Sequence, residues 1–416
     1  MKEKRIHRAW GMLAGCCLLQ GGSLGLIHNC RGIFYDPIIR ELGFGMGAFT
    51  FYVLFFGACS CLILPVVGKL FARYDSRLLL GGASFVFAGS AFCMGLFRTL
   101  PAFYIAGAFQ GLAGAFLMFF PAPYILGNWF KKKTGLAVGI SAAVSGFVGV
   151  VGNPLGNAII ERFGWRIGYF VFGAVSLLMM LPVSVLLLRA RPEDVGLLPY
   201  GQEEAPDAAA CPLEGVPTGE AKRTVSFWLL IAAGMLAAME CAYYAHFTPL
   251  GVYFGYGSSV GALLVSLSMA GNMASKVLLG HIYDRWGLGI SLAVGTGVTL
   301  LGFFLLLVDS APVRMAGAFL YGFCMAMSAI MIAISVKDVY GSRGYGDLLG
   351  YSSLVSTLGT SLNNCLIGFM VDGFGKQRGY ILSLWGGIVM TAVMGILFIV
   401  SIRGGRKTAE RFRLPL

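Results

Sequence analysis

The chain has 416 residues, of which 57% are hydrophobic and only 12% are charged. This balance excludes an ordinary soluble domain, because charged residues make up about a quarter of such a domain. The net charge of +12 does not indicate a nucleic-acid partner, because the basic residues gather in alternate loops between apolar segments.

Twelve apolar segments fill nearly the whole chain, and short charged or Gly/Pro-rich turns separate them. About 20 apolar residues at 1.5 Å per residue span a hydrocarbon core of ~30 Å. The sequence therefore predicts an all-α membrane protein with twelve transmembrane helices. We place them at residues 9–33, 48–70, 78–98, 101–126, 135–160, 166–189, 226–252, 258–282, 288–309, 312–336, 346–370 and 379–402.

Lys and Arg residues are divided unequally between the two sides of this predicted bundle. Alternate loops place 22 of them on the side of both termini and 7 on the other side, while Arg31 and Lys276 fall inside spans. By the positive-inside rule, the richer side is cytoplasmic. We therefore expect a multi-pass protein of the plasma (cell inner) membrane with both termini in the cytoplasm.

One long polar stretch divides the chain into two halves. It holds seven acidic residues and five prolines between Ala190 and Arg223, which indicates a flexible cytoplasmic linker. We expect an N-terminal six-helix bundle at residues 1–189, the linker at 190–225, and a C-terminal six-helix bundle with a basic tail at 226–416.

The two halves repeat one another. The segment Gly-Lys-Leu-Phe-Ala-Arg-Tyr from Gly68 corresponds to Gly-His-Ile-Tyr-Asp-Arg-Trp from Gly280, and the same offset of 212 residues carries Gly156 onto Gly368. A duplicated six-helix half resembles the major facilitator superfamily. The resemblance implies the major facilitator fold, a substrate site between the halves near the membrane midplane, and a cycle that rocks one bundle against the other.

The loop from Gly280 matches the superfamily signature Gly-x-x-x-Asp-Arg-x-Gly, with Asp284 and Arg285 at the charged positions. Its counterpart in the first half keeps Arg73 but has Ala72 in place of the Asp. In the family this loop helps to hold the inward gate shut. The resemblance therefore implies a gating role for Asp284, Arg285, Arg73 and Gly280.

Three further stretches are similar to the monocarboxylate transporter and oxalate/formate antiporter branch. They are Asn-Trp-Phe-Lys-Lys-Lys-Thr-Gly-Leu-Ala-Val-Gly-Ile from Asn128, Phe-Gly-Trp-Arg from Phe163, and Arg-Pro-Glu-Asp-Val-Gly-Leu-Leu-Pro from Arg191. These are framework motifs, so they indicate the branch and leave the substrate open.

Three formally charged side chains fall well inside the predicted spans: Arg31, Glu240 and Lys276. A charge at a helix centre costs about 2.5–3.5 kcal/mol even on lenient insertion scales, so each should face a partner or a watery cavity. Lys276 shares a helix face with Asn272, four residues earlier, so both are substrate-binding candidates. In the branch that the chain resembles, an Arg at the Lys276 position binds the substrate carboxylate, which implies an anion site. The alternative is that Lys276 extends to the lipid headgroups.

Arg31 and Glu240 each allow two interpretations. Arg31 is either an interfacial anchor or a cavity residue, and Glu240 either exchanges protons or forms a permanent ion pair with a nearby cation. His28 and His246 are further proton-coupling candidates, although buried, hydrogen-bonded histidines would explain them equally. Because the resemblance implies that helices 1, 4, 7 and 10 line the cavity, the polar substrate-binding candidates also include Tyr243, Tyr321 and Gln110.

We expect a secondary transporter of a small organic anion, a monocarboxylate above all, driven by proton symport or anion exchange. The alternatives are a multidrug or other small-molecule exporter and, more remotely, a transporter-like membrane sensor. No enzyme, cofactor or metal site is expected, since no nucleophile-base pair, phosphate-binding loop or metal-ligand spacing stands out. The expected partners are the anion, protons or a counter-anion, and the lipid bilayer, and we expect a monomer.

Overall fold

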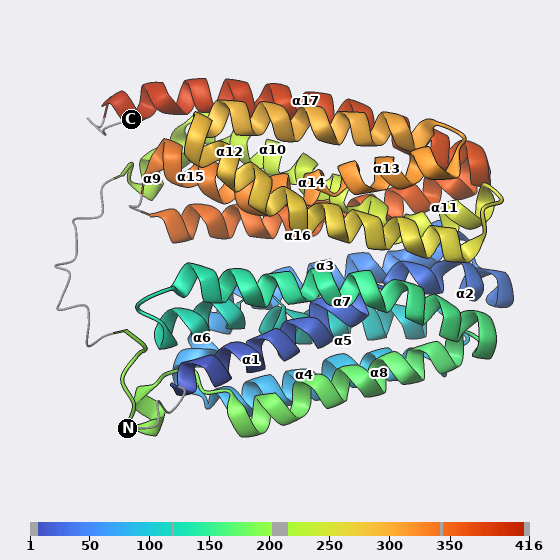
Figure 1. Cartoon of the computed structure of the whole chain (residues 1–416), viewed down its shortest axis with the longest axis horizontal. Coiled ribbons are helices and arrows are strands. Elements are labelled where there is room, and N and C mark those ends of the chain that lie inside the picture. The colour runs from blue at the N-terminus through green and yellow to red at the C-terminus, as the bar shows by residue number, and fades with distance from the viewer. Residues whose placement is uncertain (1–6, 119, 202–214, 342–343, 412–416) are drawn as a thin grey trace, which may run out of the picture. The chain divides into compact units, whose positions relative to one another are not determined.

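The computed structural model describes residues 7–118, 120–201, 215–341 and 344–411 (Figure 1). Within these ranges the chain is almost entirely helical and forms no β-strand. Eleven helical stretches among the described residues are long and apolar enough to cross a membrane. The acidic middle of the predicted linker, residues 202–214 with Cys211, lies outside the described residues.

Contacts divide the chain into two compact units. Unit 1 comprises Met1–Phe44 and Tyr52–Ala209, and unit 2 comprises Gly45–Phe51 and Ala210–Leu416. Most of unit 1 is built from α1 (Arg8–Gln20), α2 (Tyr35–Leu42), α3 (Met46–Arg73), α4 (Ser76–Met94), α5 (Leu100–Leu117), α6 (Pro121–Trp129), α7 (Thr134–Phe163) and α8 (Trp165–Pro182). The first residues of α3 group with unit 2, where the backbone N–H groups of Met46 and Gly47 donate to Asp372, each at 2.8 Å.

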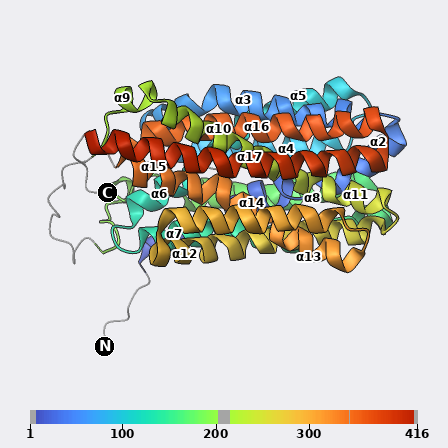
Figure 2. The ribbon, with the colours of Figure 1, turned by 90° about the horizontal axis from the view of Figure 1, so that it is seen from above.

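Unit 2 contains nine described α-helices. They are α9 (Thr218–Arg223), α10 (Val225–Glu240), α11 (Phe247–Tyr253), α12 (Gly257–Leu307), α13 (Ala311–Tyr321), α14 (Phe323–Ala326), α15 (Ile332–Tyr340), α16 (Tyr345–Phe374) and α17 (Lys376–Arg411). In both views α12 runs beside α13, and α10 packs against both α16 and α17 (Figure 2).

The longest helix, α12, contains two of the predicted spans. Its 51 residues would measure about 76 Å at 1.5 Å per residue, more than twice the ~30 Å hydrocarbon core. Gly287 interrupts it with φ 79° and ψ 176°, a backbone conformation open to glycine and unfavourable for other residues. Because α12 covers two of the predicted spans, the eleven long apolar stretches of the described residues correspond to the twelve segments that the hydropathy pattern predicts.

The first span of each half is broken near its middle. In unit 1, α1 passes into π-helical turns at Gly21–His28 (η1) and then into a 3-10 turn at Arg31–Phe34 (η2). In unit 2, α10 passes into a 3-10 segment at Cys241–His246 (η6) before α11 begins. The offset of 212 carries His28 onto Glu240 and Arg31 onto Tyr243, so the two breaks lie at equivalent positions. Such irregular backbone at membrane depth survives only where protein groups or a watery cavity satisfy it.

Each unit has its own apolar core, and glycines allow close helix contact. Unit 1 buries Trp129 and Phe87, and unit 2 buries Phe227 and Phe398. On α12, a Cβ added to Gly271 would collide with the Phe319 carbonyl of α13. Small residues at such crossings let helix backbones approach, which is how membrane helices gain packing energy in lipid.

Candidate functional site

The break in α10 exposes backbone carbonyls that neighbouring helices satisfy. A change from α-helical to 3-10 geometry leaves the last carbonyls of α10 without their usual intrahelical donors. Side chains of α16 and α13 supply the hydrogen bonds instead. Thr360, Asn363 and Tyr321 donate to the carbonyls of Ala238, Met239 and Glu240 at 2.7, 2.8 and 2.7 Å. The irregular segment is thus fixed in place, and Glu240 directly precedes it as the last residue of α10.

Glu240 is fully buried, with a side chain that is 0% exposed. Both of its carboxylate oxygens lack a hydrogen-bond partner within the described part of the chain. The Thr391 hydroxyl lies close to the carboxylate, yet its own hydrogen bond goes to the Gly387 carbonyl at 2.8 Å. No cation of the described residues in unit 2 lies within 4.0 Å of Glu240. The permanent ion pair that the sequence left open is therefore not formed within unit 2.

Lys276 lies on α12, beside the same broken segment. Its side chain is half-buried and close enough to the Cys241 thiol for the two to interact electrostatically. Cys241 in turn lies 3.2 Å from the Ser328 hydroxyl. Within the described residues Lys276 forms no ion pair, which leaves its charge available to an anion.

The position of Lys276 along α12 opposes the headgroup interpretation. Eleven residues separate it from the break at Gly287, a distance of about 16 Å along a helix. The ammonium also interacts electrostatically with Cys241, the first residue of η6. Asn272, one turn earlier, has a buried amide oxygen without a hydrogen-bond partner among the described residues, so α12 presents a second polar group.

Two predicted substrate-binding tyrosines serve the framework of unit 2. Tyr243 is 3% exposed, and its hydroxyl donates to the Ser383 carbonyl on α17. Tyr321 is 0% exposed. Its hydroxyl donates to the backbone carbonyl of Glu240 and accepts a hydrogen bond from the backbone N–H of Tyr244 at 3.2 Å. Both hydroxyls are therefore engaged inside the unit.

His246 is likewise held by hydrogen bonds. Its Nε2 lies 3.1 Å from the Asn364 carbonyl, which only accepts, so Nε2 must carry the proton. Nδ1 then accepts from the Tyr380 hydroxyl at 3.3 Å. The ring has both nitrogens engaged, as expected for a structural histidine.

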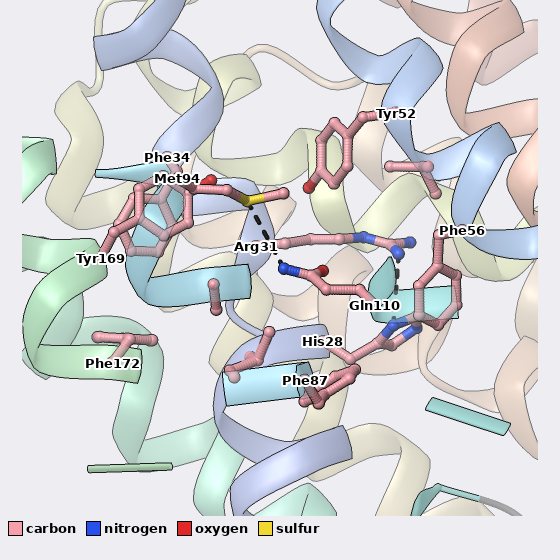
Figure 3. A pocket seen from close by; sticks show the side chains of 13 residues that line it. His28, Arg31, Phe34, Tyr52, Phe56, Phe87, Met94, Gln110, Tyr169 and Phe172 are labelled. Atoms are coloured by element: carbon pink, nitrogen blue, oxygen red, sulfur yellow. Dashed lines mark hydrogen bonds between the residues drawn. The ribbon is translucent and has the colours of Figure 1, made fainter. Parts of the chain in front are cut away.

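In unit 1, the predicted residues Arg31, His28 and Gln110 meet in one pocket (Figure 3). Arg31 is only 7% exposed, and its Nη1 lies 3.5 Å from Nδ1 of His28. Gln110 donates to the Met94 sulfur at 3.6 Å. Tyr52 and Gln110 lie on either side of the Arg31 side chain. Burial at this level does not suit an interfacial anchor, because such an anchor keeps its charged end in contact with headgroups.

The walls of this pocket are mostly aromatic. They include Phe34 stacked on Tyr169 with ring centroids 3.9 Å apart, and Phe56 beside His28 at 5.4 Å. The free space among these side chains suffices for about one water molecule. A substrate could enter only if these side chains moved apart, so Lys276 is the more accessible cationic group.

The predicted gating residues lie at helix ends. Arg73 is the last residue of α3, and Arg285 lies just before the break in α12. The Arg73 guanidinium lies 5.8 Å from the centroid of the Tyr74 ring, and that of Arg285 lies 5.1 Å from the centroid of the Trp286 ring. Asp284 is exposed, and Gly280 has no atom within 4 Å of an added Cβ. No described contact tests their role in gating.

Comparison with known proteins identifies the family. The model of the Major Facilitator Superfamily matches residues 17–363 and 247–414. The chain belongs to the major facilitator superfamily. Within it, the chain is 25% identical to monocarboxylate transporter 11 of Homo sapiens over 88% of this chain and 78% of that protein. It is also 25% identical to an MFS-type transporter of Gibberella moniliformis, over 82% and 80% of the two chains.

Shorter and structural similarities agree with this assignment. Monocarboxylate transporter 3 of Rattus norvegicus is 30% identical over 40% of this chain and 34% of its own length. A bacterial homologue of the lysosomal transporter Spinster superposes with a TM-score of 0.72 at 16% identity, covering 97% of this chain and 98% of the other. The nucleoside transporter NupG superposes with a TM-score of 0.71 at 12% identity, covering 95% of this chain and 100% of the other. This superfamily member therefore has the major facilitator fold and resembles the monocarboxylate transporter branch, as its motifs predict.

Sequence reasoning did not identify every residue of the two clusters. It missed Cys241 near Lys276 and Ser328 beside Cys241, and it missed Tyr52 and Phe56 around Arg31. A cysteine or a serine in an apolar span carries no signal of its own. Cys241 could have been suspected only because it directly follows Glu240.

Proposed function

We propose that this protein is a secondary transporter that carries a small organic monoanion, a monocarboxylate, by alternating access. The observation that supports this most is the ammonium of Lys276, which lies about 16 Å along its helix from the break at Gly287 and has no ion-pair partner among the described residues. A cation in a low-dielectric site needs a counter-charge. A substrate carboxylate supplies one, and the relatives named monocarboxylate transporters favour that chemistry.

Coupling to protons rests on Glu240. An ionised carboxylate that is fully buried without a cation or a donor is very costly, so this site accommodates the neutral, protonated acid. A change that admitted water to η6 would let the proton leave. Glu240 is therefore our proposed proton carrier, and exchange against a counter-anion is the coupling expected if it does not titrate.

A cation exporter fits the same residues less well. An exporter of lipophilic cations needs an acid that meets the drug, whereas Glu240 is 0% exposed. The other charge in this cluster, Lys276, would repel a cation. Location in the plasma membrane, termini in the cytoplasm and a monomeric state complete the proposal.

Binding by the purified protein tests this function directly. A ligand that binds only the folded protein raises its melting temperature according to RT ln(1 + [L]/Kd). We expect small monocarboxylates such as lactate to raise it in the wild type and not in Lys276→Ala. The matched control is Lys376→Ala, which removes a lysine that lies 4.7 Å from the Tyr253 ring and should leave the response intact. Stabilisation by lipophilic cations alone would reject the proposal.

A further inference from the structure

A second cavity in unit 1 lies apart from the pocket around Arg31. It has a volume of about 410 Å³ and lies between the α3–α4 turn and the chain that follows α8. Arg73 and Arg77 line it from the turn, Arg189 lines it from the end of the N-terminal bundle, and Arg191 lines it from the start of the linker. This end of the unit is the one that the positive-inside count predicts to be cytoplasmic. We call it the arginine cleft.

Two of these arginines are built into the floor of the arginine cleft. Arg189 is 8% exposed, and its Nη1 donates to the Leu188 carbonyl at 2.8 Å. Its Nε and the Nε of the half-buried Arg77 are both buried without a hydrogen-bond partner among the described residues. Arg73 and Arg191 are exposed at the mouth. A buried guanidinium that lacks acceptors is costly, unless a ligand supplies them.

The nearby acids interact with the exposed Arg191 and leave the buried Nε atoms of Arg77 and Arg189 without a partner among the described residues. Asp75 accepts the backbone N–H of Arg77 at 2.8 Å, and Asp194 accepts that of Arg191 at 3.2 Å. Neither forms an ion pair within 4.0 Å with a described arginine. Four arginines against two acids leave a formal charge of +2. Ala72 adds to the imbalance, because the superfamily signature has an Asp there.

The internal repeat shows that the buried arginines are not part of the shared framework. The offset of 212 carries Arg77 onto Gly289 and Arg189 onto Ser401. Ser401 is buried and donates to the Ser226 carbonyl at 2.7 Å, so unit 2 closes the equivalent position with a neutral hydrogen bond. Unit 1 needs neither arginine for the fold that both units share.

We propose that the arginine cleft binds a phosphate group, carried either by an anionic phospholipid or by a soluble phosphate compound. Guanidinium forks bind phosphate in bidentate fashion, and a phosphate presents more acceptor oxygens than a carboxylate to several arginines at once. Basic pockets at the cytoplasmic face of membrane proteins bind phosphate headgroups in the same way. The bound group would bridge α4 and the start of the linker. This site is separate from Lys276 and does not depend on the proposed substrate.

Two probes test the proposal with the full-length protein. Inorganic phosphate is titrated into protein in uncharged detergent at low ionic strength, and nanodiscs of phosphatidylcholine alone are compared with nanodiscs that also contain phosphatidic acid. We expect at least one probe to raise the melting temperature of the wild type. A response to both indicates a soluble phosphate compound, and a response to phosphatidic acid alone indicates a lipid headgroup.

Substitutions then locate the site. Arg77→Gln should weaken binding of the active probe about tenfold or more, because it removes a charged hydrogen-bond donor. Arg189→Gln should weaken binding to a similar extent. If Arg189→Gln does not fold because its arginine is buried, the result for Arg77→Gln alone tests the site. The matched control is Arg403→Gln, which removes an exposed arginine at the position that repeats Arg191 in unit 2. The proposal is overturned if neither probe stabilises the wild type, or if Arg77→Gln and Arg403→Gln have equal effects.

Discussion

At the scale of single residues, the two charges beside the broken segment of unit 2 remain separate. Glu240 is fully buried without a donor, and Lys276 is half-buried without an acid among the described residues. Each of them interacts electrostatically with Cys241, yet the two form no ion pair with one another. Their separation favours a neutral acid and a cation that waits for an external anion.

Glu240→Gln should separate coupling from folding. A neutral amide resembles the protonated acid, so proton-driven accumulation should stop while downhill exchange of the anion continues. The melting temperature should stay within a few degrees of the wild type, because no ion pair is broken. Counterflow in vesicles and a melting curve measure the two effects, with the exposed Glu220→Gln as control.

A permanent ion pair would give a different pattern. Gln would then leave a buried cation unpaired, at a cost of about 3–5 kcal/mol of unfolding free energy. A large loss of stability without a selective coupling defect would therefore reject Glu240 as the proton carrier.

At the scale of elements, the breaks in α1 and α10 position the candidate residues. The segment η6 holds Cys241 against Ser328 and near Lys276, and donors from α13 and α16 fix its carbonyls. These breaks were not predicted from the sequence. Hydropathy is continuous across them, and a 3-10 or π-helical turn uses the same apolar residues as an α-helical turn. Only the donors on other helices distinguish them, and those lie 80 or more residues away.

The α12–α13 crossing gives a prediction at this scale. Gly271→Ala should lower the unfolding free energy by about 1–3 kcal/mol, because its methyl group would meet the Phe319 carbonyl and force the helices apart. Gly297→Ala is the control on the same helix, since nothing lies within 4 Å of the added Cβ. Thermal unfolding in detergent compares them. Equal melting temperatures for the two variants would show that the crossing is not close-packed.

At the scale of the whole molecule, the sequence predicts the spans, the repeat and the family branch, because each depends on local composition or a short motif. It also predicts Lys276 as a cation in a membrane span. It does not predict the direction of a hydroxyl such as that of Tyr321, which depends on a partner from another helix. The arginine cleft was equally hidden, because Arg77 and Arg189 lie more than 100 residues apart.

The balance of available charges predicts selectivity among anions. Arg314 is 2% exposed, and its Nη1 lies 3.5 Å from Asp309, while Arg31 lies in a pocket with little free space. Lys276 is then the one cation of the described spans that we expect to meet the substrate, and one cation matches one carboxylate. Lactate-like monocarboxylates should compete for uptake at least about tenfold better than oxalate-like dianions. Stronger competition by the dianion would show that a second cation, with Arg31 the first candidate, takes part.

The most direct measurement is uptake of a radiolabelled monocarboxylate into vesicles that contain the wild type, Lys276→Ala, Lys276→Arg or Lys376→Ala. We predict that Lys276→Ala lowers uptake about thirtyfold or more, since removing one partner of a desolvated charge pair costs about 2–5 kcal/mol. Lys276→Arg should keep part of the activity, and Lys376→Ala should match the wild type. Wild-type uptake by Lys276→Ala, or coupled transport of a cationic dye that survives this substitution, would contradict the account.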